Sequence, residues 1–401
     1  MDCGGGRRKK EEGGSCSRGE LGERQEGESS LNGLSTHQVS LNQLVKPENR
    51  NATKMSSSPK AEPPTTTSII RGATTEFSTV HPDIIEAHIL TRLNGPALAS
   101  LSCVSSTLHS LSTQDHLWFH ICHCNWPSTV TPRVRHVIST YPEGGPRSFF
   151  AHSYPLPIMH PTSTSSNSNS APPSELISAV DIHYQNELIF TKVLETETVT
   201  GWFRCSPFRI DMLEPKDVVS TPIEHPNGDD TCTALMDDMT LSWILIDPIG
   251  RRAVNLSSNK PVSVQRHWLS GEVQVRFASI LASNNQKGSV SGFVQCEIVV
   301  TCSGSEGGEM QVSEVSLEVE DMDGKHLNGK DSLVILQRAL EGKKGKGKNR
   351  EEEGRKSQRK FLKMKKERKE KKLRREGTMD ILCVVFGVTV FATFCFFIFG
   401  N

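Results

Sequence analysis

The 401-residue sequence has no net charge and is poor in the residues that mark specialised proteins. Lys and Arg number 46 and are balanced by 46 Asp and Glu, only 6% of the residues are aromatic, and 35% are hydrophobic. The chain is therefore too polar for a polytopic membrane protein, and too long and mixed for a disulfide-stapled mini-domain. Taken alone, the zero charge favours no charged partner. One or two globular domains with polar flanks are expected.

Paired cysteine spacings and catalytic motifs are also missing from the sequence. The 11 cysteines are scattered, which predicts reduced thiols in the cytosol and neither a secreted scaffold nor a zinc finger. The charged N-terminus leads into Gly, Ser and Glu, so no secretory signal is expected. No nucleophile elbow, phosphate-binding glycine loop or HExxH motif occurs. We therefore predict a non-enzyme without catalytic residues or a cofactor.

One group of His and Cys residues resembles a metal site by residue count alone: His116, His120, Cys122, His123 and Cys124. Leu117, Trp118 and Ile121 need the same helix for packing, and no second ligand pair lies at finger spacing. No metal site is predicted.

Residues 80–126 show hydrophobic positions at helical spacing, in three short blocks. Pro82 and Pro96 stand where helices begin, and Thr113 can cap a third helix that ends before Trp126-Pro127. The second helix is expected to carry four apolar residues on one face, namely Leu98, Leu101, Val104 and Leu108. Three helices in so few residues make a small core that usually needs a partner or a neighbouring domain.

Beyond residue 175 the hydrophobic period changes to two. Strands are expected at Val193–Val199, Gly201–Cys205, Leu241–Ile246, Val273–Phe277, Phe293–Val300 and Val312–Val319, with turn formers between them. A short helix at Asp331–Leu340 should close the domain. Trp202, Trp243 and Trp268 could line a ligand groove, but aromatic residues on strands usually pack in the core, which is the preferred interpretation.

The last sixty residues hold the sharpest physical signal. Residues 381–399 carry no charge and would span roughly 28 Å as a helix, close to the thickness of a bilayer core. A buried core helix is the alternative, but nothing nearby could cover it on all sides. The apolar segment follows a basic one: residues 343–376 contain 18 basic and 6 acidic residues, a net charge of +12. Residues 71–342 contain 18 basic and 30 acidic residues, a net charge of −12.

This asymmetry predicts an acidic cytosolic body tied to a membrane by a basic segment on anionic lipid. The endoplasmic reticulum is the first expectation for that membrane. Nucleic-acid binding, which would place the protein in the nucleus, is the weaker interpretation, because the basic run has almost no aromatic residues to stack on bases.

The block from His81 to Cys122 resembles an F-box, and the layout that follows it is similar to that of a group of plant F-box proteins. Pro82, Ile84-Ile85, Ile89-Leu90, Leu93, Leu98, Val104-Ser105 and Trp118 fill the family's pattern in order and spacing. Two positions depart from it: His81 replaces the usual Leu, and Ser106-Thr107 stands where Lys or Arg is common.

The resemblance implies a substrate receptor of an SCF ubiquitin ligase, with a Skp-family adaptor that bridges to cullin and RING subunits. The adaptor contact, or the core directly under it, is assigned to ten residues: Pro82, Ile84, Ile85, Ile89, Leu90, Leu93, Leu98, Leu101, Val104 and Trp118. An anchored scaffold without a ligase role and a nuclear regulator that uses the Lys/Arg run remain the alternatives. The ubiquitination target is unknown.

The expected architecture is an α+β multidomain protein. Its predicted parts are a disordered N-terminal segment (1–75), a three-helix F-box (78–126), a connecting segment with a Pro/Ser-rich linker (127–174), an antiparallel, sandwich-like β-rich target-recognition domain (175–340), a basic juxtamembrane segment (343–376) and a single C-terminal transmembrane anchor (381–399).

Overall fold

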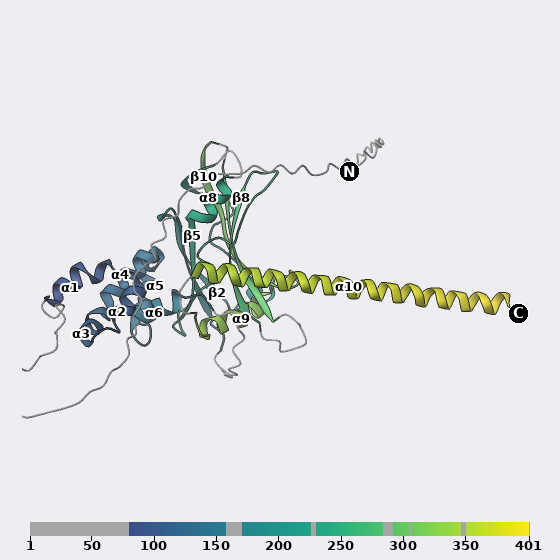
Figure 1. The fold of residues 1–401 in the computed structure, drawn as a ribbon, viewed down its shortest axis with the longest axis horizontal. Coiled ribbons are helices and arrows are strands. Elements are labelled where there is room, and N and C mark those ends of the chain that lie inside the picture. Colours follow the sequence, from purple (N-terminus) through teal and green to yellow (C-terminus); the bar gives the residue numbers. More distant parts are fainter. Residues whose placement is uncertain are drawn as a thin grey trace, which may run out of the picture. The chain divides into compact units, whose positions relative to one another are not determined.

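A computed structural model describes residues 80–157, 171–225, 230–283, 292–304, 307–345 and 350–400 (Figure 1). The N-terminal segment predicted to be disordered lies outside this described part, as do residues 158–170 of the predicted linker.

The N-terminal part of the described chain is a helical block. It consists of α1 (Pro82–His88), the 3-10 turn η2 (Leu90–Arg92), α2 (Gly95–Leu101), α3 (Ser106–Ser112), α4 (Asp115–Asn125), the 3-10 turn η3 (Pro127–Val130), α5 (Pro132–Ser139) and α6 (Gly145–Ser153). Proline occupies the first turn of α1 and α2, where its missing N–H costs no helical hydrogen bond. The amide oxygen of Asn94 accepts from Ala97 N at 3.0 Å and caps α2.

The second predicted helix is interrupted, which corrects the sequence interpretation. Helix α2 ends at Leu101 and α3 begins at Ser106, because the Ser105 hydroxyl accepts a hydrogen bond from Leu108 N at 3.2 Å and caps a new helix. Val104 therefore lies in the connecting turn, where 69% of it is exposed, and does not share an apolar face with Leu98.

The β-rich domain is antiparallel and contains two sheets. The four-stranded sheet has the order β2-β1-β5-β6, and the six-stranded sheet has the path β3-β10-β9-β8-β7 with β4 paired to β10. The strands are β1 (Glu175–Tyr184), β2 (Glu187–Glu197), β3 (Arg209–Asp211), β4 (Val219–Glu224), β5 (Met239–Asp247), β6 (Arg252–Asn255), β7 (Ser263–Arg266), β8 (Val273–Ala282), β9 (Phe293–Ser303) and β10 (Glu309–Asp321). Three helices accompany them: α7 (Gly201–Cys205), α8 (Asp230–Asp238) and α9 (Gly329–Glu341).

The four-stranded sheet is buried on both faces. Val180, Trp243 and Leu245 on one face share a hydrophobic core with the six-stranded sheet and α9. Ile177 and Ile244 on the opposite face share a second core with the helical block. Strands β1 and β5 are accordingly apolar on both faces, as is usual for a sheet covered on both sides.

Two expectations for the β-rich domain were wrong. Residues 201–205 form helix α7 and not a strand, because the Thr200 hydroxyl caps it by accepting from Phe203 N at 3.3 Å. Of the three tryptophans expected in the core, only Trp243 is buried, whereas Trp202 on α7 and Trp268 in the β7–β8 turn are 81% and 88% exposed. The closing helix was predicted well and is α9.

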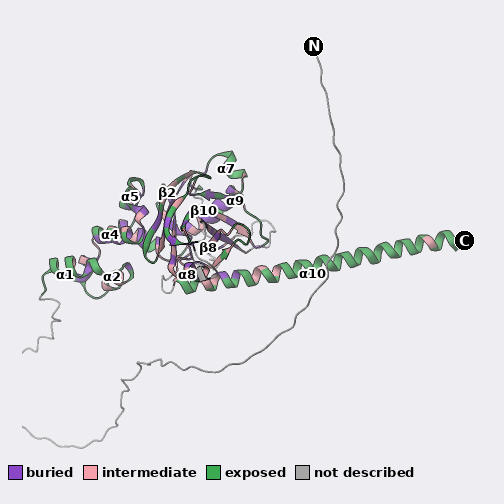
Figure 2. Ribbon diagram, turned by 90° about the horizontal axis from the view of Figure 1, so that it is seen from above, coloured by how far each residue is buried: buried purple, intermediate pink, exposed green. Residues whose placement is uncertain are grey.

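The basic segment and the apolar segment belong to one helix, α10 (Arg350–Phe399). Its first turns pack on the six-stranded sheet, where Phe361 is fully buried beside Ile280 and Met322. Lys365 pairs with Glu320 at 2.8 Å, and Arg368 pairs with Asp323 at 2.8 Å. Beyond these pairs the helix is almost entirely exposed, as the green part of α10 in Figure 2 shows.

Candidate functional site

The structure divides the ten predicted adaptor residues into a surface set and a core set. Ile85, Leu90, Leu98 and Trp118 are buried and form the core of the helical block. Leu93 and Leu101 are partly buried against that core. The exposed residues are Pro82, Ile84, Ile89 and Val104. The exposed set can form an apolar contact without rearrangement of the helices, whereas the four buried residues cannot.

Helix α6, which was not predicted, completes the core of the block. The rings of Trp118 and Phe150 lie 5.4 Å apart, and the Trp118 indole N–H donates to Ser112 O at 2.8 Å. A Cβ atom at Gly95 would lie 2.2 Å from Phe150 Cζ, so only glycine allows α2 to approach α6 this closely. The sequence signal that could have revealed α6 is Pro146 in a first turn followed by the apolar pair Phe149-Phe150.

A buried carboxylate joins the helical block to the four-stranded sheet. Asp181 on β1 accepts from Ser128 N at 2.8 Å, from the Ser128 hydroxyl at 2.5 Å and from the Thr191 hydroxyl at 2.7 Å. Nearby, the Trp126 indole N–H donates to the Ser242 hydroxyl at 3.1 Å. Burial raises the pKa of Asp181, although the hydrogen bonds favour its ionised form. This network attaches η3 to the face of the four-stranded sheet that packs on the helical block.

The exposed apolar residues of the helical block are its most distinctive surface feature. Ile84 on α1 is 51% exposed, Ile89 is 37% exposed, and Val104 in the α2–α3 turn is 69% exposed. Pro82 at the start of α1 is exposed as well. Large apolar side chains on so small a helical unit are suited to contact with another protein.

The His/Cys group on α4 is divided between surface and core. Cys124 Sγ lies 3.7 Å from His120 Nε2, one helical turn away, on the exposed side. Cys122 is buried and points toward Pro146 O at 3.8 Å. Burial raises the pKa of the Cys122 thiol to about 12, so it remains protonated at neutral pH. In the part of the chain that the structure describes, no three such residues come together as metal ligands.

The C-terminal part of α10 is long and apolar enough to cross a membrane, by length and composition. None of its most apolar window is buried against the described part of the protein. The alternative of a buried core helix is therefore not supported.

Three proteins of Arabidopsis thaliana are similar to this chain over most of its length. The protein named "Probable F-box protein At2g36090" is 49% identical over 316 residues, which cover 79% of this chain and 91% of that protein. "F-box protein At2g27310" is 42% identical over 330 residues, covering 80% and 96%. "F-box protein At3g44326" is 40% identical over 342 residues, covering 82% and 92%. No family model matches the chain, and no solved structure matches it.

The fold and the surface define a class of protein in which a helical block with exposed apolar residues packs on an antiparallel β-rich domain. The chain belongs to the plant F-box protein family. Membership of this family, which was predicted from the residues between His81 and Cys122, is thereby confirmed.

Proposed function

We propose that the protein is the substrate-recognition subunit of an SCF-type ubiquitin ligase complex and is not itself an enzyme. In this proposal the helical block binds a Skp-family adaptor, cullin and RING subunits join through that adaptor, and the β-rich domain binds the target protein. The observation that carries the proposal is membership of the plant F-box family at 40% identity or more.

The exposure of the predicted adaptor residues supports this proposal and sharpens it. We assign the contact to Pro82, Ile84, Ile89 and Val104, and assign a packing role to Ile85, Leu90, Leu98 and Trp118. Leu93 and Leu101 lie between these two sets. An apolar residue that is half exposed loses water when a partner covers it, which favours association.

Capture of a Skp-family adaptor by the full-length chain tests the assignment. Ile84→Glu, alone and with Val104→Glu, should reduce capture roughly tenfold or more, because a partner would have to bury an unpaired carboxylate. Val334→Glu is the matched control, since Val334 on α9 is an aliphatic residue with a similar exposure of 42%. Full capture by both Ile84 variants would contradict the contact face. Capture of the adaptor without cullin would favour an anchored scaffold that has no ligase role.

We further propose that α10 tethers the protein to a membrane, with the β-rich domain on the cytosolic side and the basic residues near anionic lipid. Support comes from the apolar, unburied residues 381–399 and from the basic run that precedes them in the same helix. Thirteen positions, about 20 Å of helix, separate Arg368, the last residue of α10 with an ion pair to the domain, from Ile381. The helix would therefore act as a short stalk.

Cell fractionation of the full chain and of a chain lacking residues 381–399 tests the tether. The full chain should resist alkaline extraction from membranes, and the shortened chain should be released. A full-length protein found in the nucleus would instead support the regulator that binds nucleic acid through its Lys/Arg run. The endoplasmic reticulum is the membrane to examine first.

A further inference from the structure

The free edge of the four-stranded sheet borders a cavity that no part of the adaptor assignment uses. Strand β2 is the last strand of that sheet, and among the described strands it pairs only with β1. Within the described residues, no backbone hydrogen bond joins residues 189–197 to an element other than β1. Alternate residues of such an edge present unpaired N–H and C=O groups, which can accept another strand.

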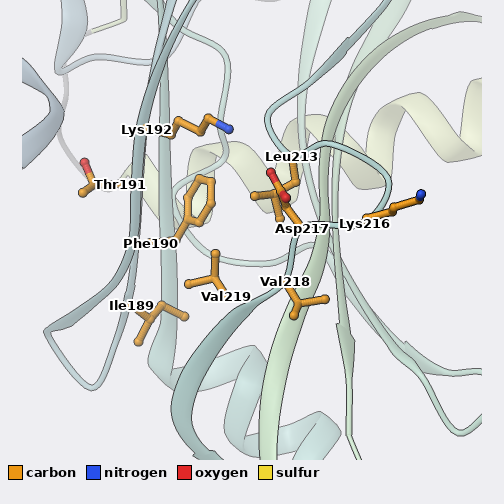
Figure 3. A pocket seen from close by; sticks show the side chains of 9 residues that line it. All are labelled: Ile189, Phe190, Thr191, Lys192, Leu213, Lys216, Asp217, Val218 and Val219. Atoms are coloured by element: carbon orange, nitrogen blue, oxygen red, sulfur yellow. The ribbon is translucent and has the colours of Figure 1, made fainter.

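A cavity of about 620 Å³ lies beside this edge, between β2 and residues 213–219 of the segment that leads from β3 into β4. Figure 3 shows the ring of Phe190 at its centre, with Leu213 and Asp217 on the facing wall. Leu213 and Val219 pack partly against the inter-sheet core, so the floor of the cavity is apolar. Its size is typical of sites that hold a side chain or a small ligand.

A β-bulge places two consecutive apolar residues at this site. Ile182 pairs with Phe190 and His183 pairs with Leu188, so Ile189 is the extra residue on β2. Ile189 and Phe190 both belong to the core between the two sheets, which a regular strand with alternating faces would not allow. Bulges interrupt pairing and re-aim side chains, and they are frequent beside binding sites.

Charge at the rim of the cavity indicates what the edge can accept. Lys192 lies two residues beyond Phe190 on the same side of β2, and Lys216 lies on the opposite wall. Neither ammonium group is within ion-pair distance of a carboxylate in the described part of the chain. Asp217 is the one acidic side chain among the lining residues, so the rim carries an excess of positive charge.

We propose that β2 binds an extended peptide of the target protein as an additional strand. An apolar side chain of the peptide lies opposite Phe190 and enters the cavity. An Asp or Glu two positions away, on the same face of the added strand, lies opposite Lys192. This inference rests on the proposed function of the β-rich domain as the target-recognition domain.

A second copy of the chain is a poorer occupant of the same edge in the register that is centred on Lys192. Antiparallel pairing of two β2 strands centred on Lys192 would place the two Lys192 residues opposite each other and Glu187 opposite Glu197. Like charges in opposed positions destabilise a strand pair. A peptide with an acidic residue meets the lysine without that repulsion.

Fluorescence polarisation with the full-length chain in lipid nanodiscs tests the proposal. The probes are fluorescein-labelled, N-acetylated octapeptides with one Leu, with Asp two positions before or after it, and with Ser or Thr elsewhere. At least one of the two orders should show saturable binding, and replacement of the Asp by Lys should abolish it. Lys192→Glu and, independently, Lys216→Glu should weaken binding roughly tenfold, whereas Lys330→Glu on the exposed side of α9 should not.

N-methylation of the probe separates strand addition from simple side-chain binding. Methyl groups on the amides of one edge of the peptide should abolish binding, and methyl groups on the other edge should leave it unchanged. Three results would overturn the proposal. They are equal effects of methylation at both edges of the peptide, equal binding of the peptide by wild type and Lys192→Glu, and a β2-dependent dimer that excludes the peptide. Capture of the adaptor by wild type is measured on the same samples. If wild type does not capture the adaptor, the proposed function is contradicted and the peptide site is not.

Discussion

At the scale of single residues, helical spacing predicted which positions of a helix are apolar but not which of them face the rest of the protein. Ile84 and Ile85 are adjacent in the F-box pattern, yet Ile84 is 51% exposed and Ile85 is 4% exposed. The difference depends on which side of α1 packs on the core of the helical block, and Ile85 belongs to that core. Sequence reasoning could therefore propose a set of contact residues, but their division into buried and exposed residues needed the tertiary contacts.

Replacement of Asp181 should destabilise the junction between η3 and the sheet. Asp181→Ala leaves three buried or partly buried donors without their acceptor, which should cost about 1–3 kcal/mol in the free energy of unfolding. Asp181→Asn keeps one acceptor oxygen, so its free energy of unfolding should lie between those of Asp181→Ala and wild type. Thermal melting of the full chain in detergent measures the difference, with the exposed Asp217→Asn as control. Unchanged melting of Asp181→Ala would show that the network does not hold η3.

The pH dependence of stability offers a second test of the same carboxylate. Because burial raises the pKa of Asp181, the unfolded chain loses this proton near pH 3.8 and the folded chain loses it at higher pH. The contribution of Asp181 to stability should therefore be largest below pH 3.8 and should decline as the pH rises through the raised pKa. Subtracting the melting curves of Asp181→Asn from those of wild type isolates this decline. A stabilising contribution of Asp181 that increases with pH would contradict this prediction.

Alkylation of the native protein should divide its described cysteines into two groups. Cys103, Cys124 and Cys205 are exposed and should react with iodoacetamide at pH 8. Cys296 and Cys302 are buried between the sheets, and burial raises the pKa of each thiol to about 12, so both should react only after unfolding. Peptide mass spectrometry distinguishes the groups. Rapid native labelling of Cys296 would be inconsistent with the inter-sheet core.

At the scale of elements, alternation predicted the long strands well because their two faces meet different surroundings. Strands β8, β9 and β10 were found from this pattern, and α9 from its helical spacing. Strand β1 was missed although the similarly buried β5 was predicted from its apolar run, because the polar residues Ser178, Asp181 and His183 interrupt the apolar residues of β1. Two predictions failed because a single hydroxyl caps a helix. Thr200 caps α7, where the hydrophobic pattern predicted a strand, and Ser105 caps α3, where the pattern predicted one continuous helix from α2.

The first turns of α10 should depend on Phe361 for their attachment to the sheet. Phe361→Ala removes a fully buried ring from the contact with Ile280 and Met322, which should cost about 3–5 kcal/mol of local stability. Trypsin should then cleave after Lys365 and Arg368 faster, because their ion pairs with the domain no longer hold. Leu373→Ala is the control, since Leu373 is 69% exposed on the same helix. Equal cleavage of wild type and Phe361→Ala would indicate that α10 is not held by this contact.

At the scale of the whole molecule, the segment between the predicted F-box and the β-rich domain is itself folded and packs on both. Residues 127–153, for which only a connecting segment was expected, form η3, α5 and α6 and contribute Val134, Phe149 and Phe150 to the core shared with the sheet. The small helical core thus gains its missing apolar surface from its neighbour. The helical block and the β-rich domain are consequently parts of one folded unit.

Removal of the helical block should therefore disable the β-rich domain. A chain limited to residues 171–345 would expose five side chains that the block now covers: Ile177, Ala179, Ile244, Ile246 and Ala253. It would also leave the Asp181 carboxyl without its two hydrogen bonds from Ser128. We expect this fragment to aggregate or to bind a hydrophobic dye, while a chain of residues 80–345 remains monomeric and binds far less dye. Light scattering and dye fluorescence compare the two.

A matched variant distinguishes loss of cover from the mere effect of truncation. Ile244→Thr with Ile246→Thr in the fragment makes two central positions of the exposed face more polar and should reduce dye binding, because strand propensity is kept while the apolar patch shrinks. The same pair of changes in residues 80–345 should instead lower the melting temperature, since both side chains are then buried under the helices. A soluble, dye-free fragment with native sequence would show that the sheet does not require the helical block, and the two parts would then be independent domains.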